Sequence, residues 1–180
     1  MKHLLLLLLL IVLVSCGTSK NTTTQAEIDA LSSLILGKAF NIESDWAYPQ
    51  ATMAMQQVSG LLGPGNNAGS INLTTNSNFL KIKGDSVYSY LPYYGERQMN
   101  VGYGGTDSSI EFKGLMENYS ERTGKNQSVI IAFDAQNSSN AENFTVTITL
   151  WPNLNSQIYL NSISRNSIQY IGRVEVLKDK

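Results

Sequence analysis

The sequence has one histidine, His3, and one cysteine, Cys16, and both stand near its N-terminus. A single cysteine forms no intramolecular disulfide bond, so the fold depends on its hydrophobic core. Charged residues make up only 15% of the chain, with a formal net charge of −1 and no run of one sign. Without a basic stripe or patch, the sequence excludes electrostatic binding to DNA or RNA, and we expect no nucleic-acid partner.

The N-terminal segment carries the first positive signal. Met1-Lys2-His3 is followed by seven leucines and then by Ile11-Val12-Leu13-Val14-Ser15-Cys16. A positive start, a short apolar run and small residues at the end are typical of a secretory signal peptide. The cysteine directly after them resembles the lipobox of bacterial lipoproteins, in which that cysteine is acylated and becomes the first residue. A plain signal peptide or a membrane anchor is the alternative, but about 20 apolar residues are needed to span a bilayer.

Cleavage before Cys16 would remove residues 1–15, and His3 with them. The mature chain would then have no histidine and no free thiol, which excludes Ser-His-Asp and Cys-His catalysis and zinc sites built on those ligands. We therefore expect no metal and no cofactor. Residues 16–23 would be the lipidated cysteine and a small, polar tether, so the lipid bilayer is the first expected partner.

The rest of the chain, residues 24–180, is predicted to be a single β-rich domain. Thr24 and Glu27 fit a capping box, and apolar residues at helical spacing follow as far as Gly37, which predicts a helix over 24–37. From 40 to 177 apolar and polar residues alternate, and Gly84-Asp85 is typical of a hairpin turn. The predicted strands are 40–46, 70–75, 79–83, 86–91, 109–113, 127–134, 144–150, 156–162 and 167–177.

These eight or nine short strands have no helices between them. Parallel strands need long crossover connections, so the sheet is expected to be antiparallel. The predicted fold class is mainly β, with an antiparallel sandwich or a partly closed barrel beside one N-terminal helix. Both architectures fit the pattern.

Two segments resemble a known family. Lys83–Gly95, KGDSVYSYLPYYG, and Ser162–Gly172, SISRNSIQYIG, are similar to the two signature blocks of Bacteroidetes lipoproteins catalogued as domain of unknown function 4251. The resemblance runs through about 40–177 and implies an envelope lipoprotein, but it names no substrate. Glu96 stands where the family pattern has arginine, and Arg97 follows one residue later.

The resemblance also bears on location. In Bacteroidetes an acidic run after the lipidated cysteine resembles the signal for export to the outer surface, and no such run follows Cys16. We therefore expect a lipid-anchored protein of the cell envelope, at the outer membrane and facing the periplasm.

Tyrosines supply the candidate binding residues. Tyr88, Tyr90, Tyr93, Tyr94 and Tyr103 lie in one stretch, with Arg97 close by and Arg165 in the second signature block. Tyrosine has a rigid apolar body with a polar tip, so the cluster suits an aromatic rim for a ligand or partner. The alternative is that the tyrosines cover a sheet face. Arg165 would hold an acidic group or tie two loops together.

The remaining candidates are carboxylates and tryptophans. Glu96, Asp107 and Glu111 are the possible acid–base residues of a glycan hydrolase, although Glu111 also fits the solvent side of a strand. Trp46 ends one predicted strand and Trp151 directly follows another, and either would stack on a sugar or cover the sheet.

Three functions follow from these features. The leading hypothesis is a non-catalytic module that binds an envelope protein or a small ligand through its tyrosines. The alternatives are a carboxylate hydrolase of envelope glycans and a structural or assembly protein of the outer membrane. A cavity lined by tyrosines, a facing carboxylate pair, or a filled core with an exposed aromatic surface would distinguish them.

Overall fold

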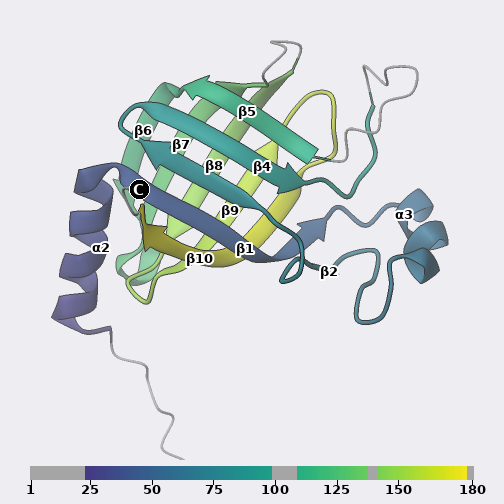
Figure 1. The fold of residues 1–180 in the computed structure, drawn as a ribbon, viewed down its shortest axis with the longest axis horizontal. Helices are drawn as coiled ribbons and strands as arrows, with labels where there is room; N and C mark the ends of the chain where they lie inside the picture. Colours follow the sequence, from purple (N-terminus) through teal and green to yellow (C-terminus); the bar gives the residue numbers. More distant parts are fainter. Residues whose placement is uncertain (1–22, 99–108, 138–141, 178–180) are drawn as a thin grey trace, which may run out of the picture.

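The computed structural model describes residues 23–98, 109–137 and 142–177, which form an antiparallel, mainly β fold (Figure 1). The helices are α2 (Gln25–Gly37) and α3 (Met53–Val58), and the strands are β1 (Ala39–Pro49), β2 (Ile71–Asn72), β3 (Phe79–Lys83), β4 (Ser86–Pro92), β5 (Ser109–Leu115), β6 (Glu117–Thr123), β7 (Val129–Gln136), β8 (Asn143–Leu150), β9 (Asn155–Asn161) and β10 (Ile168–Val176). Nine strands pair in the order β5-β4-β3-β1-β10-β9-β8-β7-β6, and β2 pairs with β1 outside this path.

The sheet curls into a nearly closed barrel, so the partly closed barrel is the architecture that forms. Its two edge strands, β5 and β6, follow one another in the chain. Phe112 of β5 forms an isolated bridge with Asn137, just beyond β7, and β6 then pairs with β7 from Glu117 opposite Asp134. In Figure 1, β4 and β5 consequently stand in front of β7, β8 and β9.

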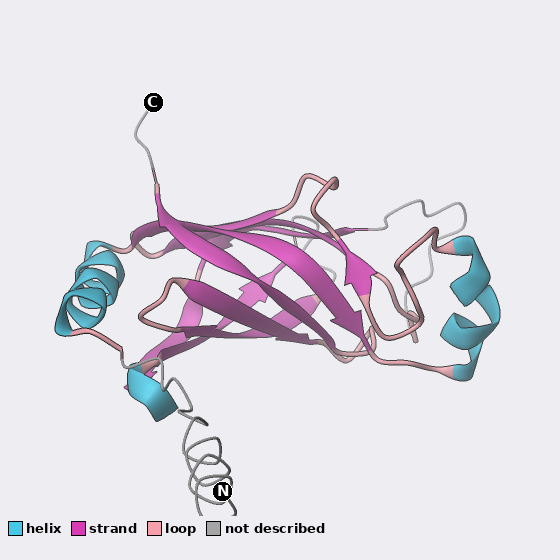
Figure 2. Ribbon diagram, turned by 90° about the horizontal axis from the view of Figure 1, so that it is seen from below, coloured by secondary structure: helices cyan, strands magenta, loops and turns pink. Residues whose placement is uncertain are grey.

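The predicted N-terminal helix is present as α2. The Thr24 hydroxyl accepts the Glu27 N–H, while the Glu27 carboxylate accepts the Thr24 N–H at 2.8 Å, which completes the capping box. Leu31, Leu34 and Ile35 are buried in the same core as the strands. Helices α2 and α3 lie at opposite ends of the barrel (Figures 1 and 2). None of the helices in the described residues has the length and apolarity to cross a membrane.

One strand and one α-helix are missing from the sequence-based prediction, which expected one helix, as are the short 3-10 helices Ser59–Leu61 and Lys125–Gln127. Strand β6, with the sequence ENYSERT, is one of the two edge strands and has no buried side chain. Its sequence therefore shows no alternation of apolar and polar residues from which a strand could be predicted. Helix α3 has only six residues, too few for a helical period to stand out.

Inward-facing residues fill the barrel with one hydrophobic core that also includes residues of α2. Among its largest fully buried side chains are Tyr170, Phe40, Phe112, Phe133 and Phe144. Each such side chain contributes about 1.5–3 kcal/mol when fully removed from water, so this core holds the disulfide-free fold together.

A bulge at Asp45 decides which side chains of β1 face outward. Pairing with β10 shifts register between Ser44 and Trp46, and the inward positions change from even to odd numbers there. Trp46 and Tyr48 therefore point away from the core, although Ser44 points into it.

Two residues support this bulge. Gly172 of β10 lies so close to β1 that a Cβ atom there would be 1.9 Å from the Glu43 carbonyl oxygen. The buried Asn78 replaces a missing strand partner, because its side-chain amide accepts the Ser44 N–H at 2.8 Å and donates to the Ser44 carbonyl at 2.9 Å.

Candidate functional site

The tyrosines predicted as one cluster are divided between the outside and the inside of the barrel. Strand β4 alternates between exposed and buried positions, so Tyr88 and Tyr90 face outward. The same alternation continues past the strand and places Tyr93 in the interior, where it is 8% exposed. Tyr94 packs partly against the core, and its hydroxyl accepts a hydrogen bond from Asn76 at 3.2 Å.

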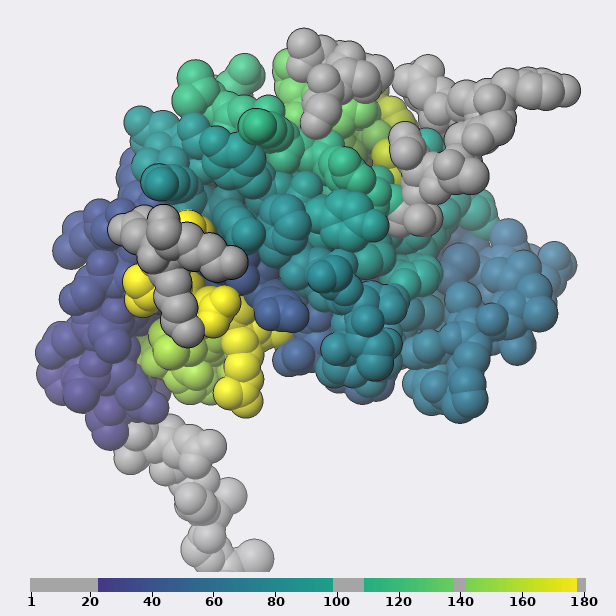
Figure 3. Space-filling view, in the orientation of Figure 1, coloured from purple at the N-terminus to yellow at the C-terminus, as the bar shows by residue number. Residues whose placement is uncertain are grey.

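Tyr88 and Tyr90 belong to an outward-facing set on three neighbouring strands, which we call the charged wall. Its members are Phe79 and Lys81 of β3, Tyr88 and Tyr90 of β4, and Glu111 and Lys113 of β5. Phe79 lies opposite Tyr90, and the two ring centroids stack 6.4 Å apart. The strands of this wall form the front surface in Figure 3.

Lysines of the charged wall lie over its rings. The Lys81 Nζ is 4.4 Å from the centroid of Phe79, and the Lys113 Nζ is 5.8 Å from that of Tyr88. Each such exposed cation–π contact contributes about 0.5–1 kcal/mol. With Glu111 opposite Tyr90, the wall combines aromatic surface with charges of both signs. Aromatic groups rimmed by polar ones are typical of protein–protein interfaces.

A second group of candidate residues meets at the barrel end that carries α3, and we call it the barrel-end cluster: Tyr93, Glu142, Arg165 and Tyr170. The Arg165 Nε donates to both carboxylate oxygens of Glu142, at 3.0 and 2.9 Å. Both side chains are buried, at 7% and 8% exposure. The guanidinium carbon also lies 5.1 Å from the Tyr93 ring centroid.

The barrel-end cluster joins three segments that are distant in sequence. The Tyr93 hydroxyl shares its hydrogen bond between the carbonyl oxygens of Glu96 and Asn166, each at 3.0 Å. Arg97 and Arg165 form an isolated backbone bridge, so the 93–98 segment lies along the 164–166 segment. Glu142 was missed by sequence reasoning. Arg165 thus holds the buried Glu142 carboxylate and ties these loops together.

Burial also sets the protonation of the two tyrosines in this cluster. Desolvation raises the pKa of Tyr93, and it raises the pKa of the fully buried Tyr170 well above the usual value, while the nearby Arg165 charge opposes both shifts. Both phenols are therefore neutral donors at physiological pH. Tyr170 uses its proton in a 2.8 Å hydrogen bond to the Pro92 carbonyl.

The two described members of the carboxylate hypothesis lie in different environments. Glu111 is exposed on β5 opposite Tyr90 and accepts a hydrogen bond from Ser109 at 2.8 Å. Glu96 is exposed at the barrel end and accepts a hydrogen bond from Thr52, the residue that caps α3. Each carboxylate thus accepts a hydrogen bond from a hydroxyl of its own region. Glu96 and Glu111 therefore do not form a facing carboxylate pair.

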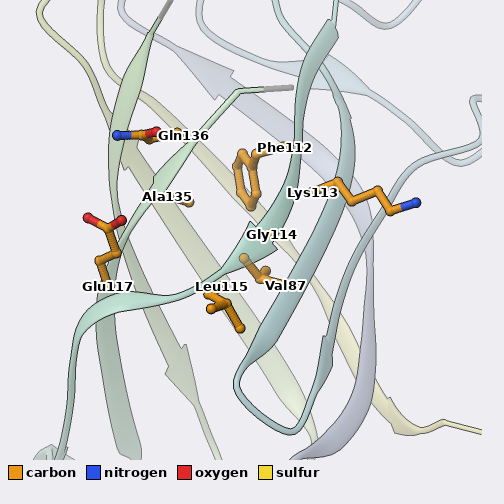
Figure 4. Close-up of a pocket in the computed structure, with 8 residues that line it drawn as sticks. All are labelled: Val87, Phe112, Lys113, Gly114, Leu115, Glu117, Ala135 and Gln136. Atoms are coloured by element: carbon orange, nitrogen blue, oxygen red, sulfur yellow. The ribbon is translucent and has the colours of Figure 1, made fainter. Parts of the chain in front are cut away.

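Several surface hollows are present. One, of about 190 Å³, lies in the seam between β5 and β7, where residues 113–116 have no partner on β7 (Figure 4). Phe112 and Ala135 face each other across it, while Lys113 points away. A neighbouring hollow of about 250 Å³ extends over Asp134 and Thr145. A third, of about 280 Å³, adjoins Trp151. The predicted tyrosines that the structure describes line none of these three.

Three sequence-predicted residues, Cys16, Tyr103 and Asp107, lie outside the described residues. Within the described ranges, no group of three or more histidine, cysteine, aspartate or glutamate side chains is arranged to hold a metal ion.

Comparisons with known proteins identify a family and a structure of similar fold. A family model described as "Domain of unknown function (DUF4251)" matches residues 22–174. The crystal structure of a DUF4251 family protein from Bacteroides eggerthii DSM 20697 superimposes with a TM-score of 0.55, covering 84% of this chain and 88% of that one. The two sequences are 14% identical, so this likeness concerns the fold alone. No curated protein matches the sequence.

Proposed function

This chain belongs to the DUF4251 family, whose description assigns no activity, and we propose from its surface chemistry that it is a non-catalytic binding module of the cell envelope. In this proposal acylated Cys16 anchors the chain at the outer membrane, facing the periplasm. A partner protein docks on the charged wall.

The observation that carries the proposal is the exposed aromatic surface over a filled core. Tyr90 is 40% exposed although it stacks with Phe79, and both rings lie where β3 and β4 pair without a register shift. Tyrosines in such positions are over-represented among residues that dominate binding energy. Lys81, Lys113 and Glu111 supply charges that would give a partner its orientation.

Capture from envelope extracts tests the proposal. The full chain, solubilised in detergent, is compared with a Tyr88→Ser/Tyr90→Ser variant. Tyr48→Ser/Tyr159→Ser is the matched control, because Tyr48 and Tyr159 are 36% and 41% exposed on other strands. We expect one partner whose capture falls about tenfold or more in the first variant only. Equal capture by all three proteins would overturn the charged wall as the docking surface.

Anchoring needs its own test. Cells fed labelled palmitate should label the wild-type chain, and a Cys16→Ser variant should be unlabelled and recovered in the soluble fraction. A wild-type chain without label would overturn the lipid anchor and leave the binding proposal intact.

A further inference from the structure

A second set of outward-facing residues lies on β1, β10 and β9, and we call it the amide wall. Its members are Trp46 and Tyr48 of β1, Gln169 and Ile171 of β10, and Gln157 and Tyr159 of β9. Trp46, Ile171 and Gln157 form one row across the strands, and Tyr48, Gln169 and Tyr159 form the next. No member carries a charge, and the wall consists of three aromatic rings, two side-chain amides and one isoleucine.

At one edge of the amide wall lies the hollow of about 280 Å³, which is lined by Trp151, Asn153, Asn155, Ser156, Gln157 and Ile171. None of these six residues is charged. The nearest charged residues in the strand register are Arg173, beside Asn155, and Glu43, opposite Arg173. Their signs are opposite, so the hollow has no strong electrostatic preference.

The turn between β8 and β9 holds this hollow in a fixed shape. The Trp151 N–H donates to the Asn155 carbonyl at 3.0 Å, and the Leu154 N–H donates to the Trp151 carbonyl at 2.8 Å. The Asn153 side-chain oxygen accepts the Asn155 N–H at 3.1 Å. A ligand would therefore meet a preformed site and would lose little free energy in ordering the turn.

Polar groups in the hollow remain available for a ligand. Among the residues that the structure describes, the side-chain amides of Asn155 and Gln157 have no hydrogen-bond partner. Each amide offers two donors and an acceptor, which is the mixed capacity that a sugar hydroxyl matches. The Trp151 ring supplies an apolar surface on which the C–H face of a pyranose stacks.

We propose that this hollow binds one ring of a neutral saccharide, stacked on Trp151 and hydrogen-bonded to the amides of Asn155 and Gln157. Its volume lies below the roughly 300–1,000 Å³ of sites for drug-sized ligands, which suits a single sugar ring. This site is on a different wall from the proposed protein interface, and neither depends on the other.

Tryptophan fluorescence provides the test, since the chain has two tryptophans and a Trp46→Phe variant leaves Trp151 as the reporter. The full-length variant, in a detergent without a sugar headgroup, is titrated with glucose, mannose, galactose, N-acetylglucosamine and their β-1,4-linked oligomers. We expect at least one neutral sugar to change the emission saturably, with no dependence on salt. No saturable change with any of these sugars would overturn the proposal.

A pair of matched substitutions assigns the hydrogen bonds. In the Trp46→Phe background, Gln157→Leu removes an amide that lines the hollow, and Gln169→Leu removes one that lies on the same wall outside it. We expect about tenfold weaker binding for Gln157→Leu and no change for Gln169→Leu, with both variants checked for folding by circular dichroism. Equal effects of the two substitutions, or tighter binding of glucuronate than of glucose, would overturn the assignment.

Discussion

The charged wall and the amide wall contain equally exposed tyrosines with different neighbours. Tyr90 on the first and Tyr159 on the second are 40% and 41% exposed. Around Tyr90 lie a stacked phenylalanine and a carboxylate, with lysines over the neighbouring rings, whereas Tyr159 lies opposite Gln169 on one side and Thr147 on the other. Alternation along a strand thus decides that a ring faces outward, and the neighbouring strands decide which partner suits it.

The largest expected effect comes from breaking the barrel-end cluster, which would disturb both walls together. Glu142→Ala leaves the buried Arg165 without its counter-charge, which should cost about 3–5 kcal/mol of unfolding free energy. Urea denaturation measures this loss. Glu142→Leu/Arg165→Met removes both charges and should recover most of it. A loss below about 1 kcal/mol in Glu142→Ala would contradict a buried, energetically coupled pair.

The same substitution should affect the strands behind the two walls differently. At Gly172, next to the bulge of β1, an added Cβ would be 1.9 Å from the Glu43 carbonyl oxygen. At Gly114 of β5, it would meet nothing within 4 Å. We expect Gly172→Ala to cost about 1–3 kcal/mol or more, and Gly114→Ala to stay within about 0.5 kcal/mol of wild type. Thermal unfolding of both variants checks this, and equal midpoints would refute the close approach.

Three tyrosines that belong to neither wall, Tyr93, Tyr119 and Tyr170, should make the folded state less stable as the pH rises into the alkaline range. Burial raises the pKa of Tyr93 and of Tyr170, and desolvation, with a hydrogen bond to Glu121, raises the pKa of Tyr119 to about 12. The folded state therefore holds these protons more tightly than the unfolded state, in which tyrosine titrates near pH 10. The contribution of these tyrosines to stability should be constant below that pH and should be lost above it. A smaller fall in Tyr170→Phe would identify one source, and a flat profile in the wild type would contradict the shifts.

The smallest expected effect is removal of charge from the charged wall, which makes it resemble the amide wall. Lys81→Gln/Lys113→Gln removes two exposed cation–π contacts and should cost about 1–2 kcal/mol in unfolding free energy at most. Capture of the protein partner should lose part of its salt dependence, while Gln169→Lys on the amide wall leaves capture unchanged. If the salt dependence of capture is unchanged in the lysine variant, these two charges do not contribute to docking.

Much of the fold follows from local patterns in the sequence. The capping box at Thr24 and the alternation of β8 predict α2 and an inward apolar face, and both form. Closure into a barrel depends instead on long-range geometry: the β1 bulge at Asp45 and the β6 bulge, where Asn118 has a φ of 51°. Such irregularities arise from packing against distant strands, so the periodicity of the local sequence does not predict them.

The candidate sites were only partly accessible to the same reasoning. Tyr93 is two positions after the buried Leu91, and Glu142 is two positions before the buried Phe144. Continued strand alternation therefore points both side chains inward. The alternation thus predicts a phenol and a carboxylate inside the barrel, and a buried carboxylate needs a buried partner of opposite charge. The partner, Arg165, lies in a loop with no period. The amide wall could not be predicted from the sequence either, because its rows cross β1, β10 and β9, and no local pattern shows that these strands pair.

Pairing of β1 with β10 has a consequence for how the barrel assembles. Among the described strands, the first and the last, β1 and β10, are neighbours in the middle of the sheet order, and β10 is the last of them to be synthesised. Until it is available, β1 and β9 are both open edges, and the two halves of the sheet have no common strand. Closure of the barrel therefore waits for β10, and a chain truncated before Ile168 would yield two sheets that share no strand and have unpaired edges, instead of a smaller barrel.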